Sequence, residues 1–170
     1  MKNAEEGFSL IELMVTLAIM IILMAVAIPS FNETMLGSKL TSNANDFVAS
    51  LNKARSEAIK RNSTITFCAS TCAAGSTTCT CATGGGWDQG WVILAGTEIL
   101  LRHVSLDTRL KMTDASSVRS ITLQPTGVGS TQATITLCQN SPSVGSQERV
   151  ISVSATGRAS LTSTANGVCS

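Results

Sequence analysis

The 170-residue sequence is poor in the side chains from which many binding and catalytic sites are built. It has no tyrosine, four phenylalanines and two tryptophans, so it offers no row of aromatic rings on which single-stranded nucleic acid could stack. Its one histidine, His103, has no serine, cysteine or carboxylate at a recognisable catalytic spacing. The chain also lacks a phosphate-binding loop, a metal-binding helix and a Cys-x-x-Cys redox motif. We therefore expect a protein that is not an enzyme and that uses neither a cofactor nor a metal.

What the sequence does contain is a long apolar stretch at residues 8–28. Its 21 residues are enough, at the helical rise, to cross a hydrocarbon core of about 30 Å. Glu12 is the one charged residue in this stretch. A charge inside a membrane helix costs roughly 2.5–3.5 kcal/mol on insertion scales. An acidic residue at this position therefore indicates a functional role. We expect residues 8–28 to span a membrane and the carboxylate of Glu12 to meet an amine.

An ordinary secretory signal is the main alternative for this region. Residues 25–27, Ala-Val-Ala, match the small-residue pattern that precedes a signal-peptidase site. However, the segment before the apolar stretch contains Glu5 and Glu6 against Lys2, and such a net acidic segment suits a secretory signal poorly. Neither an export signal nor a plain anchor has a reason to carry Glu12.

Residues 29–62 are predicted to continue the helix with one apolar face. Pro29 removes one backbone hydrogen bond, so we expect a kink or a loosened turn there. Apolar residues then recur at spacings of three and four, and Lys60 and Arg61 complement the helix dipole at the end. The apolar positions are Leu36, Leu40, Ala44, Phe47, Leu51, Ala54 and Ala58. This stripe needs a surface to pack on, and the remaining chain is expected to supply a sheet.

Residues 63–170 change to the alternating pattern of strands. Short apolar runs and alternating segments are separated by turn signals at residues 84–86, 125–127 and 141–143. The expected strands centre on residues 65–67, 91–94, 99–104, 121–123, 135–137 and 151–155. The predicted fold class is therefore α+β, with one long N-terminal helix packed on an antiparallel sheet of about six to eight strands.

Four of the six cysteines lie in one loop, residues 68–86, that is rich in serine, threonine and glycine. In an exported chain, cysteines are more often disulfides than thiols. These four, Cys68, Cys72, Cys79 and Cys81, allow three pairings. We favour a nested arrangement, Cys68 with Cys81 and Cys72 with Cys79, although the sequence does not choose among the three. Zinc is an alternative, although the Cys-x3-Cys-x6-Cys-x-Cys spacing is not that of a familiar zinc site.

The N-terminal residues resemble the processing site of type IV prepilins and type II secretion pseudopilins. The residues that carry this resemblance are Gly7, Phe8 and Glu12. It implies that a prepilin peptidase removes residues 1–7 and N-methylates Phe8. It also implies that Glu12 meets the N-terminal ammonium of a neighbouring subunit during filament assembly. Such a pair attracts much more strongly in a low-dielectric medium than in water.

The remainder of the chain resembles the GspH/FimT family of minor pilins and pseudopilins. The resemblance is carried by residues 51–61 (LNKARSEAIKR), 90–93 (GWVI), 101–103 (LRH) and 149–158 (RVISVSATGR). It implies a pilin-like fold, a disulfide between Cys138 and Cys169, and a periplasmic domain at residues 63–170 behind an inner-membrane helix. The implied partners are other pilins or pseudopilins, which the N-terminal helix contacts. The implied function is that of a minor pilin that primes or joins a type IV pilus, with a type II secretion pseudopilin as the alternative.

A second alternative is DNA binding during natural transformation. Some members of this branch are thought to use a C-terminal Gly-Arg-x-Arg motif, and this chain has Gly157-Arg158-Ala159-Ser160. With Ser160 in place of the second arginine, at least one phosphate contact is missing, which weakens binding and its salt dependence. The candidate DNA contacts are Arg158, Arg149, Lys60 and Arg61.

Overall fold

The computed structural model describes residues 9–72, 75–129, 131–140, 147–164 and 169. The chain divides into two compact units, Met1–Gly37 and Ser38–Ser170. One helix, α1 (Leu10–Arg61), supplies most of the first unit and continues into the second. Its backbone stays helical through residue 29, so the proline does not end the helix.

The end of α1 is set by a left-handed residue. Asn62 has φ +48°, a conformation that asparagine tolerates better than most residues. Its N–H donates to the carbonyl of Ile59 at 3.3 Å, and the N–H of Ser63 donates to the carbonyl of Ala58 at 3.2 Å. This is the Schellman pattern, and it satisfies two carbonyls that the helix itself leaves unpaired.

The described residues form eight antiparallel strands in two sheets of four, so the expectation of a single sheet is wrong. The first sheet has the order β3-β2-β1-β5, from β1 (Ile65–Ala69), β2 (Trp91–Ala95), β3 (Glu98–His103) and β5 (Ser120–Leu123). The second has the order β4-β6-β7-β8, from β4 (Leu110–Asp114), β6 (Ala133–Gln139), β7 (Glu148–Val153) and β8 (Ala159–Thr164). Alternation in the sequence shows which face of a strand is buried, but not which strands pair, so it could not separate the two sheets.

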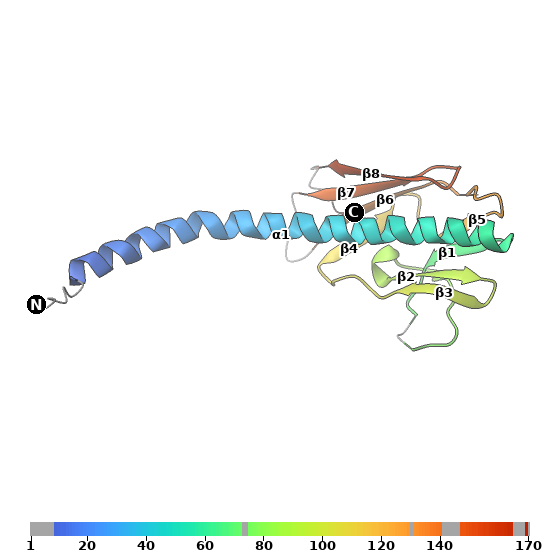
Figure 1. Ribbon diagram of the computed structural model, residues 1–170, viewed down its shortest axis with the longest axis horizontal. Coiled ribbons are helices and arrows are strands. Elements are labelled where there is room, and N and C mark those ends of the chain that lie inside the picture. Colours follow the sequence, from blue (N-terminus) through green and yellow to red (C-terminus); the bar gives the residue numbers. More distant parts are fainter. Residues whose placement is uncertain (1–8, 73–74, 130, 141–146, 165–168, 170) are drawn as a thin grey trace, which may run out of the picture. The chain divides into compact units, whose positions relative to one another are not determined.

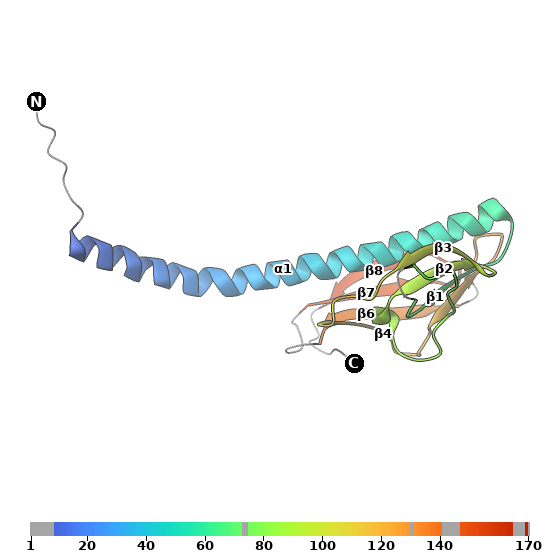
Figure 2. The same cartoon turned by 90° about the horizontal axis from the view of Figure 1, so that it is seen from below.

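Within the second unit, the C-terminal half of α1 packs on both sheets. Figure 1 shows this part of the helix lying across the strands, with β6–β8 above it and β1–β3 below it in the view, and Figure 2 shows the strands on one side of it. The predicted apolar face is confirmed, because six of its seven side chains are fully buried. These six are Leu40, Ala44, Phe47, Leu51, Ala54 and Ala58.

Phe47 lies at the centre of the aromatic core. Its ring centroid is 4.9 Å from that of Phe67, 5.0 Å from that of Trp87 and 5.4 Å from that of Trp91. Both contacts with tryptophan are edge-on, which is a favoured geometry for aromatic rings. Trp87, in the short 3-10 helix η1 (Trp87–Gln89), donates its indole N–H to the carbonyl of Val118, and Trp91 donates to the hydroxyl of Ser50. The two tryptophans therefore belong to the core.

Candidate functional site

The predicted cleavage site lies outside the residues that the structure describes, whereas Glu12 lies within them. Gly7 and Phe8 lie outside the described residues. Glu12 lies in the first turn of α1 and is exposed. Its backbone N–H approaches the carbonyl of Ser9 at 3.1 Å and the Ser9 hydroxyl at 3.4 Å. Ser9 is therefore the N-cap of α1, and Glu12 takes the position that an acid occupies in a capping box.

Sequence inspection alone overlooked this cap, although Ser9-Leu10-Ile11-Glu12 fits the Ser-x-x-Glu pattern. The consequence is that Glu12 has a local reason to be where it is. A carboxylate at a helix N-terminus is favoured by the helix dipole and by the free N–H groups of the first turn. Any role in assembly has to be separated experimentally from this local one.

The first part of α1 presents apolar side chains on all sides. Every large apolar side chain from Leu10 to Phe31 is at least half exposed. The helix is the one in the described part of the chain that is long and apolar enough to cross a membrane, with a mean hydropathy of 2.7 over its most apolar 18 residues. A helix that is apolar all round needs lipid or other helices as its surroundings.

All six cysteines are paired in the structure. The loop has the nested arrangement: Cys68, in β1, is bonded to Cys81, and Cys72 is bonded to Cys79 nearer the tip, each pair with Cα atoms 5.5 Å apart. Cys138–Cys169 is the third bridge, with Cα atoms 5.6 Å apart. Sulfurs held in disulfides are not the thiolates that zinc requires, so the loop pairing leaves the zinc alternative without ligands.

The disulfide-bonded loop is also held by hydrogen bonds to the domain. The Ser70 hydroxyl donates to the carbonyl of Thr80 at 2.9 Å, and the N–H of Ala82 donates to the carbonyl of Ala69 at 2.8 Å. The guanidinium of Arg102, on β3, donates to the carbonyl of Ser76. The loop is therefore tied to the first sheet near both its base and its tip.

Two of the four candidate DNA contacts are engaged within the domain. The guanidinium of Arg61 contacts the carboxylates of Glu98 at 2.6 Å and Glu57 at 2.7 Å. These hydrogen bonds raise the pKa of Arg61 and lower the pKa of Glu57. Arg149 donates to the Thr41 hydroxyl at 3.1 Å and to the Ser163 hydroxyl at 2.9 Å. Neither arginine is presented freely to a phosphate.

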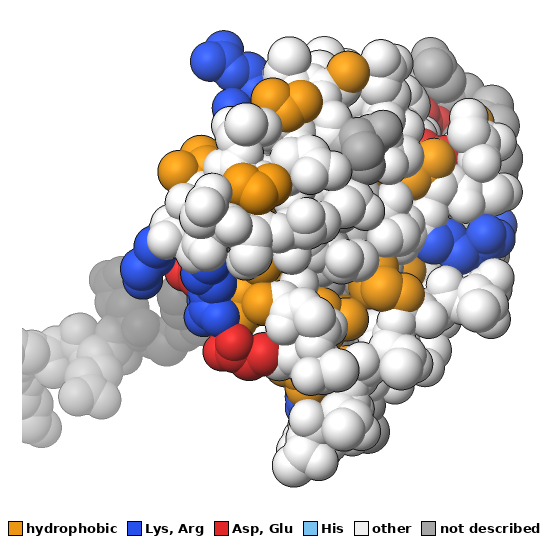
Figure 3. Space-filling view, turned by 90° about the vertical axis from the view of Figure 1, so that its right-hand side faces the viewer, with side chains coloured by type: hydrophobic (Ala, Val, Ile, Leu, Met, Phe, Trp, Pro, Cys, Tyr) orange, Lys and Arg blue, Asp and Glu red, His pale blue; other side chains and the backbone are white. Residues whose placement is uncertain are grey.

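The other two candidates, Lys60 and Arg158, are exposed, and their side chains have no hydrogen bond or ion pair with the described residues. Arg158 follows the turn between β7 and β8, whereas Arg149 pairs with Ser163 toward the opposite end of the same hairpin. At the rise of a strand, these two positions are on the order of 15 Å apart. Figure 3 faces the end of the domain at which α1 ends, and it shows the lysines and arginines in separate groups, with neutral and apolar surface between them. The four residues are not brought together into one basic site.

One exposed cluster was not anticipated from the sequence. Asp107 contacts the guanidinium of Arg109 at 2.6 Å and the ammonium of Lys39, on α1, at 3.6 Å. The side-chain hydrogen bond from Arg109, supported by its backbone N–H, holds the pKa of the Asp107 carboxyl well below its usual range. The cluster links α1 to the loop between β3 and β4, and nothing in its geometry suggests chemistry.

Comparison with known proteins gives two family matches. The family model described as "Type II transport protein GspH" matches residues 43–157, and the "Prokaryotic N-terminal methylation motif" matches residues 2–28. Among curated proteins, no significant match is found.

Solved structures of two kinds resemble the chain. The type IV minor pilin FimU of Pseudomonas aeruginosa, in one crystal form, is 27% identical with a TM-score of 0.58, covering 74% of this chain and 89% of FimU. A second crystal form of FimU gives 27% identity and a TM-score of 0.55, with 72% and 92% covered. The minor pseudopilin EpsH from the type 2 secretion system of Vibrio cholerae is 11% identical with a TM-score of 0.50, covering 73% of this chain and 96% of EpsH. EpsH is therefore a likeness of fold alone.

The GspH match covers more than half of the chain, and the methylation motif covers the apolar N-terminus. FimU and EpsH share with this chain the architecture of a long helix packed on antiparallel sheets. The protein therefore belongs to the GspH family of minor pilins and pseudopilins.

Proposed function

We propose that this protein is a minor pilin of a type IV pilus, a structural subunit that joins or primes the filament. The observation that carries the proposal is the likeness to FimU, a type IV minor pilin, at 27% identity over 74% of the chain. The pseudopilin EpsH matches with 11% identity, which supports a shared fold and nothing more specific.

The first part of α1 supplies the physical basis for assembly. A prepilin peptidase removes residues 1–7 and methylates Phe8, and the exposed apolar helix holds the subunit in the inner membrane with its domain in the periplasm. On assembly, this helix exchanges lipid for a bundle of similar helices. The exchange is close to neutral in hydrophobic energy, since lipid tails are as apolar as the side chains, so specific contacts decide the register.

Glu12 is the residue that we propose sets this register. The ammonium of Phe8 in one subunit and the carboxylate of Glu12 in another are each costly inside an apolar bundle. Together they form a pair whose attraction is strong because the surroundings have a low dielectric constant. The absence of other charges from residues 8–28 gives the amine no competing partner in that stretch.

The test is deletion of the gene in the source bacterium, followed by counting of surface pili and assay of exoprotein secretion. We expect fewer pili, recovery when the wild-type chain is supplied, and unchanged secretion. Loss of secretion with a normal number of pili would instead assign the protein to a type II secretion system.

DNA binding receives less support. Of the four candidate contacts, Arg61 and Arg149 are engaged by neighbouring residues, and only Lys60 and Arg158 are exposed without a described partner. A gel-shift series at low salt, comparing the wild-type chain with Arg158→Ala, tests it. If the wild-type chain shows no shift, the DNA hypothesis is removed.

A further inference from the structure

Among the described residues, strand β8 lies at the edge of its sheet. It is the last strand in the order β4-β6-β7-β8, and all six of its residues pair with β7 in a continuous register from Ala159–Val153 to Thr164–Glu148. In an antiparallel pair, alternate residues point their N–H and C=O groups away from the partner strand. No described strand pairs with β8 on that other side. Figure 1 shows β8 at the margin of the domain.

Strand β8 lacks three features that commonly protect a sheet edge: a charged residue, a proline and a bulge. Residues 159–164, Ala-Ser-Leu-Thr-Ser-Thr, include no charged residue and no proline. The pairing with β7 contains no bulge, and Ser160, Thr162 and Ser163 are exposed. Natural proteins usually block such an edge with a charge, a proline or a bulge, because an open edge accepts a strand from another chain.

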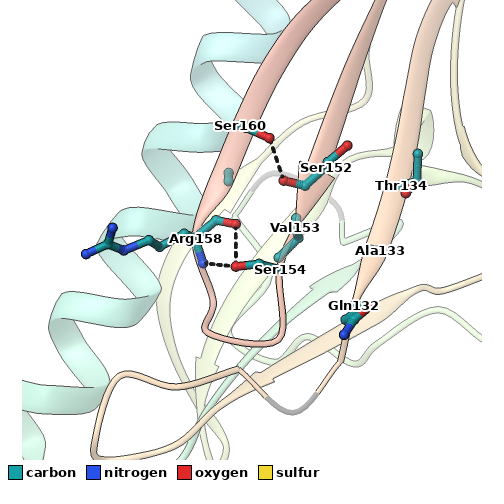
Figure 4. Close-up of a pocket in the computed structure, with 9 residues that line it drawn as sticks. Gln132, Ala133, Thr134, Ser152, Val153, Ser154, Arg158 and Ser160 are labelled. Carbon is teal, nitrogen blue, oxygen red and sulfur yellow. Dashed lines mark hydrogen bonds between the residues drawn. The ribbon is translucent and has the colours of Figure 1, made fainter.

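A cationic side chain stands at the beginning of this edge. Arg158 is exposed, and its backbone closes the β7–β8 turn through hydrogen bonds with Ser154 at 2.9 Å and 3.2 Å. In Figure 4 its guanidinium extends past β8 on the side away from Ser152 and Thr134. Arg158 is the one charged residue among those that line a shallow hollow of about 530 Å³ beside this turn. Within the described part of the chain, its guanidinium has no ion pair or hydrogen bond.

We propose that an extended segment of a different pilin subunit adds to the open edge of β8 as a fifth strand, with a carboxylate of that segment bound to Arg158. The proposal rests on the proposed function, since it needs neighbouring subunits in a filament. Charge complementarity selects the occupant. A second copy of this chain pairing through its own β8 would bring only neutral residues 159–164 to the edge and would leave both Arg158 side chains without an acid.

The experiment uses full-length chain in filament-producing cells, with the photocrosslinking residue p-benzoylphenylalanine in place of Thr162. The matched control places it at Ser116, an exposed residue in the turn between β4 and β5. After irradiation, filaments are sheared from the cells, and crosslinked peptides are identified by mass spectrometry. We expect the residue at position 162, and not at 116, to join this chain to one extended, acid-containing segment of another subunit of the filament.

Charge reversal then tests the role of Arg158. We expect Arg158→Glu to reduce the crosslink about fivefold or more, since an attractive contact becomes repulsive, whereas Lys53→Glu, the same reversal on an exposed position of α1, leaves it unchanged. Reversal of the partner's acid to lysine should restore the crosslink to Arg158→Glu.

Three results would overturn the proposal: no crosslink from position 162 in filaments that contain the chain, a crosslink only to a second copy, or a crosslink that Arg158→Glu leaves unchanged. In each of these the proposed function stands. If the wild-type chain is absent from the filaments, the proposed function fails, and the strand addition fails with it.

Discussion

Glu12 can act in two ways, and both depend on its place at the beginning of α1. Its backbone N–H is capped by Ser9, and its carboxylate is favoured by the helix dipole of its own chain. In the assembly that we propose, the same carboxylate neutralises an ammonium of another subunit. The local role needs a polar side chain that can accept a hydrogen bond, whereas the intersubunit role needs a negative charge.

Comparison of Glu12→Gln with Glu12→Val separates the two roles. Glutamine keeps the acceptor of a capping box but has no charge. We expect both variants to insert into the membrane normally and to enter filaments at least about tenfold less than wild type, because a lone buried ammonium is strongly unfavourable. The measurement is the ratio of the chain in sheared filaments to the chain in membranes. Normal incorporation of Glu12→Gln would reduce Glu12 to a helix cap.

Asp107 offers a test of the domain's electrostatics. The hydrogen bonds from Arg109 lower its pKa in the folded state, so the resulting stabilisation is present above the unfolded pKa of about 3.9 and is lost as the pH falls through the lower, folded value. We expect an NMR titration of the Asp107 carboxyl to have its midpoint below the ordinary value. Arg109→Ala should raise that midpoint clearly, and Lys39→Ala should raise it less, because Lys39 lies farther away at 3.6 Å. An equal response to the two variants would contradict the assignment.

Among the elements, α1 combines two kinds of surface in one continuous helix. From residue 10 to residue 31 its large apolar side chains are exposed, and from Leu40 onward one face is buried against two sheets. The second part is held by packing, with Phe47 in contact with three other aromatic rings. The disulfides add covalent ties at the loop and at the C-terminal strands.

Phe47→Ala tests whether this aromatic contact anchors α1 to the domain. Truncating a fully buried phenylalanine typically costs about 3–5 kcal/mol. We expect a loss of this size in denaturant unfolding of the full chain in detergent, followed by the fluorescence of Trp87 and Trp91. The control is Asp46→Ala, at the neighbouring exposed position, which should stay within about 0.5 kcal/mol of wild type. Equal stability of the two variants would show that α1 is held in some other way.

The disulfides should differ in their contribution according to the loop that each closes. Cys138–Cys169 has a sequence separation of 31 residues, and Cys72–Cys79 one of 7. In the chain-entropy model, these correspond to about 3–4 kcal/mol and about 2 kcal/mol. We expect paired Cys→Ser replacement of the first bridge to lower the free energy of unfolding more than replacement of the second. The reverse order would show that local packing of the Cys-rich loop outweighs loop closure.

For the whole molecule, the features that local pattern specifies could be predicted from the sequence. The period of the apolar residues identified the buried face of α1, and the abrupt change to alternation at Ser63 marked the start of the β-rich domain. The nested loop disulfides were one of three pairings that the sequence allowed. Each of these depends on residues that are close together in the chain.

The features that depend on distant contacts were missed. Strand β4 has only Leu110 and Met112 as alternating buried residues, and β8 contains a single leucine among serines and threonines, so neither was predicted. Without them the division into two sheets could not be inferred. The engagement of Arg61 by Glu98 and of Arg149 by Thr41 also joins residues far apart in sequence, so the basic candidates looked more available than they are.

The most direct test of the account is the mass and N-terminal sequence of the chain recovered from purified filaments. If the protein is a pilin subunit whose helix is exchanged from lipid into the filament, the recovered chain begins at an N-methylated Phe8 and contains Glu12. Recovery of a chain that begins at Ile28 would contradict the account, because a signal peptidase would then have removed the helix on which assembly depends.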